Sequence, residues 1–162
     1  MKIMEYLIFN INNDSFAILM TDVNEVLMMC TLYNIPGSPP FLVGVLNLRG
    51  KLFPVVDLTQ RLGFQRHMAK SQNEKKLVPL YAKNTKILLT TTNNMTIGMI
   101  IDGFSNLKDI DNNLERKSVV NEKAIPTYID GMVIIEAKII QIVKIKNVMS
   151  QEELALLQQI ET

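Results

Sequence analysis

The sequence has very few of the residues on which enzyme chemistry and metal binding depend. Its 162 residues include one cysteine, Cys30, one histidine, His67, and no tryptophan. A single cysteine excludes an internal disulfide and a cysteine metal cluster, and one histidine cannot complete a zinc site. A cysteine or serine nucleophile needs a base beside it, whereas His67 lies in a polar stretch typical of an exposed loop. We therefore expect no catalytic residue, no metal and no cofactor.

The sequence also lacks glycine-rich motifs and an excess of charge of one sign. The seven glycines are scattered, and none stands in a G-x-G or G-K-[ST] motif that would cradle a phosphate. Lysine and arginine total 17 against 16 acidic residues, so there is no strong positive field for nucleic acid or an anionic membrane. The aromatic residues lie mostly at apolar strand positions rather than on a stacking platform. Nucleic acid is therefore not an expected partner.

No apolar run is long enough to cross a membrane. The N-terminal run, residues 6–9, is cut off by Asn10, and the more apolar stretch 132–143 is interrupted by Glu136, Lys138 and Gln141. Apolar residues make up 48% and charged residues 20%, which is typical of a globular protein. We expect a soluble cytoplasmic protein without direct membrane insertion.

The sequence contains short apolar segments separated by turn residues. This pattern predicts an all-β protein, with a short helical turn over 21–27 and a C-terminal helix over 150–162. That helix begins with Ser150 and Glu153, the spacing of a capping box. Polar loops are expected over 64–76 and 107–125. Strands are expected at 5–11, 16–20, 30–33, 77–81, 87–92 and 95–101, on both sides of a turn at 47–50, and as a pair between 128 and 143.

The second half of the chain repeats features of the first half, which indicates two small five-stranded barrels rather than one large sandwich. We expect one compact domain over 1–162, with a first barrel over 1–63, a connecting loop over 64–76 and a second barrel over 77–149. At an offset of 81 residues, 98–101 align with 17–20. At an offset of 87 residues, Tyr128 aligns with Phe41, Gly131 with Gly44, Lys138 with Lys51, and Val143 with Val56.

Residues 41–63 form the strongest local pattern, a strand, a turn and a second strand. Gly50 allows the chain to reverse tightly, and Arg49 is the only charge between residues 41 and 50. In the second copy the turn Asn47-Leu48-Arg49-Gly50 becomes Ile-Ile-Glu-Ala at 134–137. Residues needed only for barrel closure would be expected in both copies. The difference therefore favours a role for the first turn in contacting a partner.

Residues 35–63, IPGSPPFLVGVLNLRGKLFPVVDLTQRLG, resemble the CheW family, the coupling proteins of bacterial chemotaxis. The shared features are a proline-punctuated loop, a glycine, an Asn-Leu-Arg-Gly turn, a proline and an Asp-Leu ending. Residues 16–18 and 23–27 also fit the family pattern, and 97–102 fit it more loosely. The resemblance implies that both barrels are SH3-like and that they pack together.

The resemblance further implies an adaptor that binds the regulatory domain of the CheA histidine kinase and the cytoplasmic tip of chemoreceptors. It would hold both in a signalling array without doing chemistry. Two alternatives stay open: a coupling protein of a parallel pathway, such as one that controls twitching pili, or an SH3-like adaptor for peptides or nucleic acid. The expected partner-binding residues are Val23, Glu25, Gly44, Asn47, Leu48, Arg49 and Gly50.

Arg49 also has a purely structural interpretation, because it could simply neutralise Glu25. An exposed pair of this kind contributes only about 0–1 kcal/mol to stability. The two interpretations are compatible, since a paired arginine can also fix the shape of a docking surface. Both require Glu25 and Arg49 to lie close together in the fold.

Overall fold

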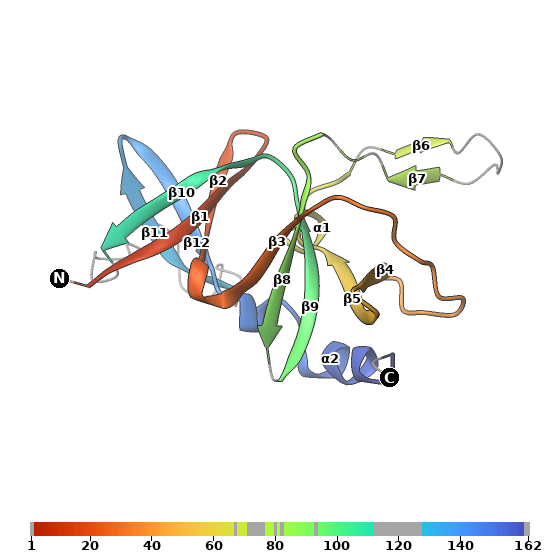
Figure 1. Cartoon of the computed structure of the whole chain (residues 1–162). Coiled ribbons are helices and arrows are strands. Elements are labelled where there is room, and N and C mark those ends of the chain that lie inside the picture. The colour runs from red at the N-terminus through yellow and green to blue at the C-terminus, as the bar shows by residue number, and fades with distance from the viewer. Residues whose placement is uncertain are drawn as a thin grey trace.

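The computed structural model describes residues 2–66, 68–70, 77–79, 81, 83–92, 94–111 and 128–160. These residues form a mostly β structure with two short α-helices, α1 (Leu58–Arg61) and α2 (Gln151–Gln158) (Figure 1). The strands are β1 (Ile3–Ile11), β2 (Asp14–Leu19), β3 (Val23–Met28), β4 (Leu42–Leu48), β5 (Lys51–Asp57), β6 (Met68–Lys70), β7 (Leu77–Pro79), β8 (Lys86–Thr92), β9 (Met95–Ile101), β10 (Phe104–Asp111), β11 (Ile129–Ile135) and β12 (Lys138–Val143).

Ten of these strands form two five-stranded sheets that lie side by side (Figure 1). Sheet A has the order β10-β1-β2-β12-β11, and sheet B has the order β3-β8-β9-β5-β4. The remaining strands, β6 and β7, pair only with each other and project from the body of the molecule (Figure 1). The predicted fold class was all-β, with two packed five-stranded SH3-like barrels and a short C-terminal helix; it is confirmed by the two five-stranded sheets and that helix.

The repeat is visible in the strands themselves. An offset of 81 residues carries β1, β2 and β3 onto β8, β9 and β10, and an offset of 87 carries β4 and β5 onto β11 and β12. Equivalent strands hold equivalent places in the two sheets, and in each sheet one pair is parallel, β2 with β12 and β5 with β9. The two sheets are therefore two copies of one arrangement.

The sheets do not follow the expected division into residues 1–63 and 77–149. Strands β1 and β2 join β10–β12 in sheet A, whereas β8 and β9 join β3–β5 in sheet B. Each repeat thus gives its first two strands to the other sheet. Local alternation shows that a segment is a strand but carries no information about which distant strand it pairs with, so the sequence could not reveal this exchange.

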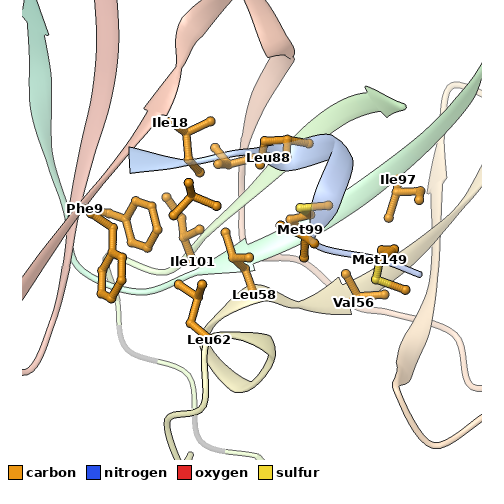
Figure 2. Close-up of a cluster of buried hydrophobic side chains, with 14 of the residues drawn as sticks. Phe9, Ile18, Val56, Leu58, Leu62, Leu88, Ile97, Met99, Ile101 and Met149 are labelled. Atoms are coloured by element: carbon orange, nitrogen blue, oxygen red, sulfur yellow. The ribbon is translucent and has the colours of Figure 1, made fainter. Parts of the chain in front are cut away.

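The buried apolar residues form three groups, one within each sheet and one shared by both sheets. One group lies inside sheet A and includes Tyr6 and Ile8, and another lies inside sheet B and includes Ile87 and Leu89. The largest, shown in Figure 2, lies between the sheets, and it includes Leu154 and Leu157 of α2. Strands β1 and β8 serve two groups each, because successive side chains point to opposite faces. The residues labelled in the shared core are Phe9, Ile18, Val56, Leu58, Leu62, Leu88, Ile97, Met99, Ile101 and Met149.

Small residues occupy equivalent places inside the two sheets. Ala17 on β2 is fully buried in the core of sheet A, and Gly98 is its equivalent on β9. A Cβ atom at Gly98 would lie 3.0 Å from methyl groups of both Ile87 and Val55. The core of sheet B therefore has less room at this position than the core of sheet A.

Several expected elements differ in the structure. The helical turn over 21–27 is instead a 3-10 turn, Met20–Asp22, followed by strand β3. Pairing with β8 determines the conformation there, because it satisfies backbone groups that a single helical turn leaves open. Residues 30–33 form only an isolated bridge from Tyr33 to Val45.

Two regions expected to be loops also contain strands. Helix α1 follows β5 directly, and the loop over 64–76 contains β6. The irregular region over 107–125 begins as strand β10, and its remaining residues lie outside the described part of the chain, as does His67. The sequences of the two strand segments are largely polar and lack a regular alternation of apolar and polar residues, so the pattern did not predict them.

The C-terminal helix agrees with the prediction. The Ser150 side chain accepts from the Glu153 backbone N–H, and the Glu153 side chain accepts from the Ser150 backbone N–H, which completes the capping box. Leu154 and Leu157 are buried in the shared core, and Ile160 packs against it. Among the described residues, no helix is long and apolar enough to span a membrane.

The hairpin turns of the two sheets have the same backbone geometry but are built from different residues. Arg49 and Gly50 have φ of 53° and 84°, and their equivalents Glu136 and Ala137 have φ of 51° and 64°. Two positive φ values identify a two-residue turn of the type that suits the twist of a hairpin. Ala137 is therefore held in a conformation that favours glycine.

Replacing Ala137 by glycine should stabilise the protein by about 1 kcal/mol, because glycine removes the clash that an L-residue meets at positive φ. The reverse change, Gly50→Ala, should destabilise it by a similar amount. Open space surrounds Gly50, so strain rather than crowding would be the cause. Denaturant unfolding of both variants measures the effect, and an Ala137→Gly variant no more stable than the wild type would contradict the assigned strain.

Candidate functional site

The β4–β5 hairpin ends in a rigid tip at residues 47–50. The Asn47 side-chain Oδ1 accepts a hydrogen bond of 3.2 Å from the Gly50 backbone N–H, which fixes the turn from the inside. Arg49 stands at the first turn position, and its side chain is 74% exposed. The tip therefore presents a guanidinium on a well-defined backbone.

Arg49 reaches across the open side of sheet B to strand β3. Its Nη2 atom lies 3.2 Å from the Glu25 Oε1 atom, and the Glu25 side chain is 35% exposed. The predicted contact between Glu25 and Arg49 is confirmed, although Glu25 lies on a strand and not on a helical turn. Strands β3 and β4 are the two edges of sheet B, so the contact shows how strongly the sheet curls. An exposed pair adds little stability, and its main effect is to orient Arg49.

The chain that follows β3 closes sheet B. Tyr33 and Val45 exchange two backbone hydrogen bonds of 2.9 and 2.8 Å, which cover part of the outer edge of β4. A Cβ atom at Gly44 would lie 2.9 Å from the Tyr33 carbonyl oxygen, closer than such contacts occur. This close approach explains why a glycine stands at position 44. Gly44 is buried, so it supports the shape of the site and does not contact a partner directly.

Val23 and Leu48 are less accessible than a docking residue should be. Val23 is partly buried against the shared core, and Leu48 is partly buried against the core of sheet B. Leu52, which lies opposite Asn47 in the hairpin, is 44% exposed and was not among the expected site residues. The sequence signal that could have revealed Leu52 is its position as an apolar residue two places after the turn glycine, Gly50.

Exposed apolar side chains also lie on and just after β3. Successive β3 residues alternate in exposure, with Val23, Glu25 and Leu27 half-buried and the residues between them exposed. This alternation is typical of an edge strand with one face on a core. The exposed large side chains in this region are Val26, Met28 and Tyr33.

The tip of the β11–β12 hairpin repeats this ion pair with reversed charges. Glu136 occupies the place of Arg49, and its Oε1 atom lies 3.8 Å from the Nζ atom of Lys108 on β10, the strand equivalent to β3. Each hairpin tip is thus joined to the far edge of its own sheet. The pairing itself is common to both copies, and the sign of the charge and the turn glycine distinguish the first tip.

A buried ion cluster lies at the other end of β5 and was missed by the sequence analysis. The Arg66 side chain is 4% exposed and that of Asp57 is 2% exposed. The Nη2 atom of Arg66 lies 2.8 Å from the Asp57 Oδ1 atom, and Nη1 lies 2.9 Å from the Asp102 Oδ2 atom. The Arg66 guanidinium also lies 4.7 Å from the centre of the Tyr81 ring. Arg66 is therefore not part of a solvated loop.

Hydroxyl groups complete the cluster. Thr59 and Thr85 donate to the two Asp102 carboxylate oxygens at 3.1 and 3.0 Å, and Asp57 caps the start of α1 by accepting from the Gln60 N–H. Burial acts to lower the pKa of Arg66, but its hydrogen bonds and charge attraction to both carboxylates outweigh burial and raise it. A sequence signal existed, because a carboxylate ending an apolar strand needs a nearby cation.

A clamp formed by Arg61 and Glu153 joins α1 to the C-terminal helix. Arg61 donates two hydrogen bonds of 2.6 and 2.7 Å to the Glu153 carboxylate and one of 2.9 Å to the Val148 carbonyl oxygen. Burial acts to raise the pKa of Glu153, but the bonds from Arg61 and Ser150 outweigh burial and lower it. This clamp fixes α2 over the shared core.

The lowered pKa of Glu153 makes part of the stability depend on pH. The stabilisation from its ionised form is complete above the pKa of a free glutamate and is lost as pH falls through the lower pKa of the folded protein. The Glu153→Gln variant should therefore be less stable than the wild type by about 1–2 kcal/mol near neutral pH. Denaturant unfolding from about pH 6 to about pH 3 should show this difference shrinking. A constant difference would contradict the assignment.

The groups needed for catalysis or for a metal do not converge at the tip. Among the described residues, no three histidine, cysteine, aspartate or glutamate side chains are placed to hold a metal ion. The arrangement at 47–50 and β3 instead offers an oriented cation, hydrogen-bonding groups and exposed apolar side chains. It is suited to contact with another macromolecule.

Comparison with known proteins gives one consistent family. The model of the CheW-like domain matches residues 5–153. Over 153 residues, 94% of this chain and 85% of the relative, the chain is 26% identical to chemotaxis protein CheW of Klebsiella aerogenes. It is 25% identical to probable chemotaxis protein CheW of Rhizobium etli over 156 residues, 92% of this chain and 89% of the relative.

A solved structure shares the fold. The crystal structure of scaffolding protein TtCheW from Thermoanaerobacter tengcongensis matches with a TM-score of 0.70. The match covers 93% of this chain and 90% of that chain, at 24% sequence identity. The two-sheet arrangement is thus not peculiar to this sequence.

Proposed function

The chain belongs to the family of CheW-like domains, and from this membership we propose that it is an adaptor that couples chemoreceptors to the CheA histidine kinase. The family consists of scaffolds rather than enzymes. In this proposal the chain binds the regulatory domain of the kinase and the cytoplasmic tip of the receptors. It works in the cytoplasm, by contact alone.

The observation that carries the proposal is the geometry of the first hairpin tip. Arg49 is oriented by Glu25, its backbone is fixed by Asn47 and Gly50, and the side chain remains exposed. An oriented charge beside exposed apolar groups lets apolar burial supply affinity while the charge sets orientation. Leu52 supplies the accessible apolar group beside the tip.

The proposed partner surface comprises Glu25, Asn47, Arg49 and Gly50, with Leu52 added and Val23, Gly44 and Leu48 as supports. The supports are assigned by their packing, since Val23 and Leu48 contact a core and Gly44 lies against the Tyr33 backbone. A change at a support alters the shape of the tip, whereas a change at an exposed residue alters only the contact. The two groups should therefore behave differently in binding assays.

The experiment that tests the proposal uses the full-length protein. Co-sedimentation with receptor-containing membranes and purified kinase should place the protein in the pellet only when its partners are present, and kinase activity should depend on it. A pull-down from the source cells, read by mass spectrometry, identifies the pathway. Recovery of a pilus-control kinase in place of CheA would favour a parallel chemosensory pathway. A protein that neither sediments with receptor membranes and kinase nor recovers any kinase or receptor in the pull-down would contradict the proposal.

A further inference from the structure

A cavity of about 430 Å³ lies where the two sheets meet, away from both hairpin tips. Sheet A contributes Tyr6, Leu19, Ile142 and Val143, and the end of β8 in sheet B contributes Thr91 and Thr92. The charged residues of its lining are Asp22, Asp130, Lys144 and Lys146. Cavities of this volume are in the range of small-molecule sites, which combine apolar walls with a few polar groups.

The lining contains a polar group that the protein leaves unsatisfied. The Thr92 Oγ1 atom is buried and is without a hydrogen-bond partner in the described part of the chain. A buried hydroxyl in this state costs free energy, and because the atom is almost inaccessible, this cost is carried within the protein. Partial burial also raises the pKa of Asp22, and the nearby Lys146 charge acts in the opposite sense.

From this lining we propose that the cavity is a binding site for a small zwitterion, that is, a free amino acid or a molecule with the same pair of charges. Two carboxylates and two ammonium groups line the same space. A simple anion would be attracted by the lysines and repelled by the aspartates, and a simple cation would meet the reverse. A ligand that carries both charges gains from both pairs. The site does not depend on the proposed coupling function.

The test is titration of the ¹⁵N-labelled full-length protein with individual free L-amino acids, followed by NMR. At least one should shift the backbone signals of Thr91, Thr92, Ile145 and Lys146 in a saturable way. Acetate supplies only a negative charge, methylammonium only a positive charge and glycerol only hydroxyl groups. None of the three should cause a saturable shift. Saturation by acetate or glycerol alone, or no saturable shift with any amino acid, would overturn the proposal.

Variants separate binding from folding. Asp22→Asn and Lys146→Met should each weaken binding about tenfold, the size expected for a lost charged contact. Asp109→Asn and Lys86→Met make the same chemical changes at residues outside the lining and should bind like the wild type. Equal weakening by the control variants would show that overall charge, and not this cavity, controls the signal.

Thr92→Val provides the sharpest comparison. It keeps the shape of the side chain and removes the unsatisfied hydroxyl, so its melting temperature should not fall and is expected to rise. Because the Thr92 Oγ1 atom is almost inaccessible, the same variant should bind the amino acid like the wild type. A loss of binding as large as that of Asp22→Asn would show that any change beside the cavity abolishes the signal, and it would overturn the assignment of binding to the charged groups.

Discussion

The Arg49→Glu variant should fold like the wild type and bind receptor–kinase assemblies at least tenfold more weakly. Arg49 is mostly exposed, and its pair with Glu25 contributes little to stability, so reversing its charge should barely move the melting temperature. At an interface the same change places a carboxylate where the partner accepts a cation. A tenfold loss corresponds to about 1.4 kcal/mol, a modest demand for a charge reversal at an interface. Co-sedimentation with receptor membranes and kinase, beside thermal melts, measures both quantities.

A charge exchange distinguishes the structural role of Arg49 from its role in binding. In Arg49→Glu with Glu25→Arg, the ion pair can re-form with reversed sign, as Lys108 and Glu136 already form it in sheet A. If the pair only fixes the tip, the double variant should recover recruitment. If the partner reads the sign of the charge, recruitment should stay lost. Full recruitment by the single variant Arg49→Glu would show that the tip is scaffold rather than interface.

The matched control is Glu136→Arg at the second tip, which breaks the equivalent ion pair. It should affect recruitment less than Arg49→Glu, and an equal loss would show that the partners do not distinguish the tips. Leu48 was among the expected partner-binding residues, but Leu48→Asp is a poor probe because Leu48 packs against the core of sheet B. Leu52→Asp tests an apolar anchor at the tip without entering a core.

Replacing Arg66 by methionine should destabilise the protein by about 3–5 kcal/mol, the largest effect expected from any single change considered for this chain. The change removes the cation that faces Asp57 and Asp102 and leaves two carboxylates close together in a largely buried site. Breaking a buried ion pair from one side has a cost of this size because the remaining charge cannot be solvated. Denaturant unfolding at neutral pH, with the wild type alongside, provides the measurement.

The control for this prediction is a variant in which the carboxylates that face Arg66 are made neutral as well. A triple variant with Arg66→Met, Asp57→Asn and Asp102→Asn removes the unpaired charges together with the arginine, so it should recover much of the lost stability. The Arg66→Met variant should also become relatively more stable in acid, where both carboxylates are protonated. An Arg66→Met variant that unfolds like the wild type would show that the side chain is not buried in solution.

What this sequence determined by itself is local. Alternation of apolar residues located most strands, Ser150 and Glu153 placed the start of α2, and the turn at 47–50 identified the hairpin that carries the candidate site. Even the contact between Glu25 and Arg49 was foreseen, because each is a lone charge in apolar surroundings. These features depend on neighbours within a few residues, or on matching single charges, and both are visible in a chain read in order.

Only the tertiary structure decided how these pieces combine. It placed β1 and β2 with the strands of the second repeat, buried Arg66 between Asp57 and Asp102, and pressed Gly44 against the Tyr33 carbonyl group. It also brought Asp22, Thr92 and Lys146 to one cavity. Each of these depends on a pairing between segments far apart in the chain, and such pairings are selected by the packing of the whole core. A local sequence pattern is compatible with many such pairings. Only one set of pairings buries all the apolar faces at once.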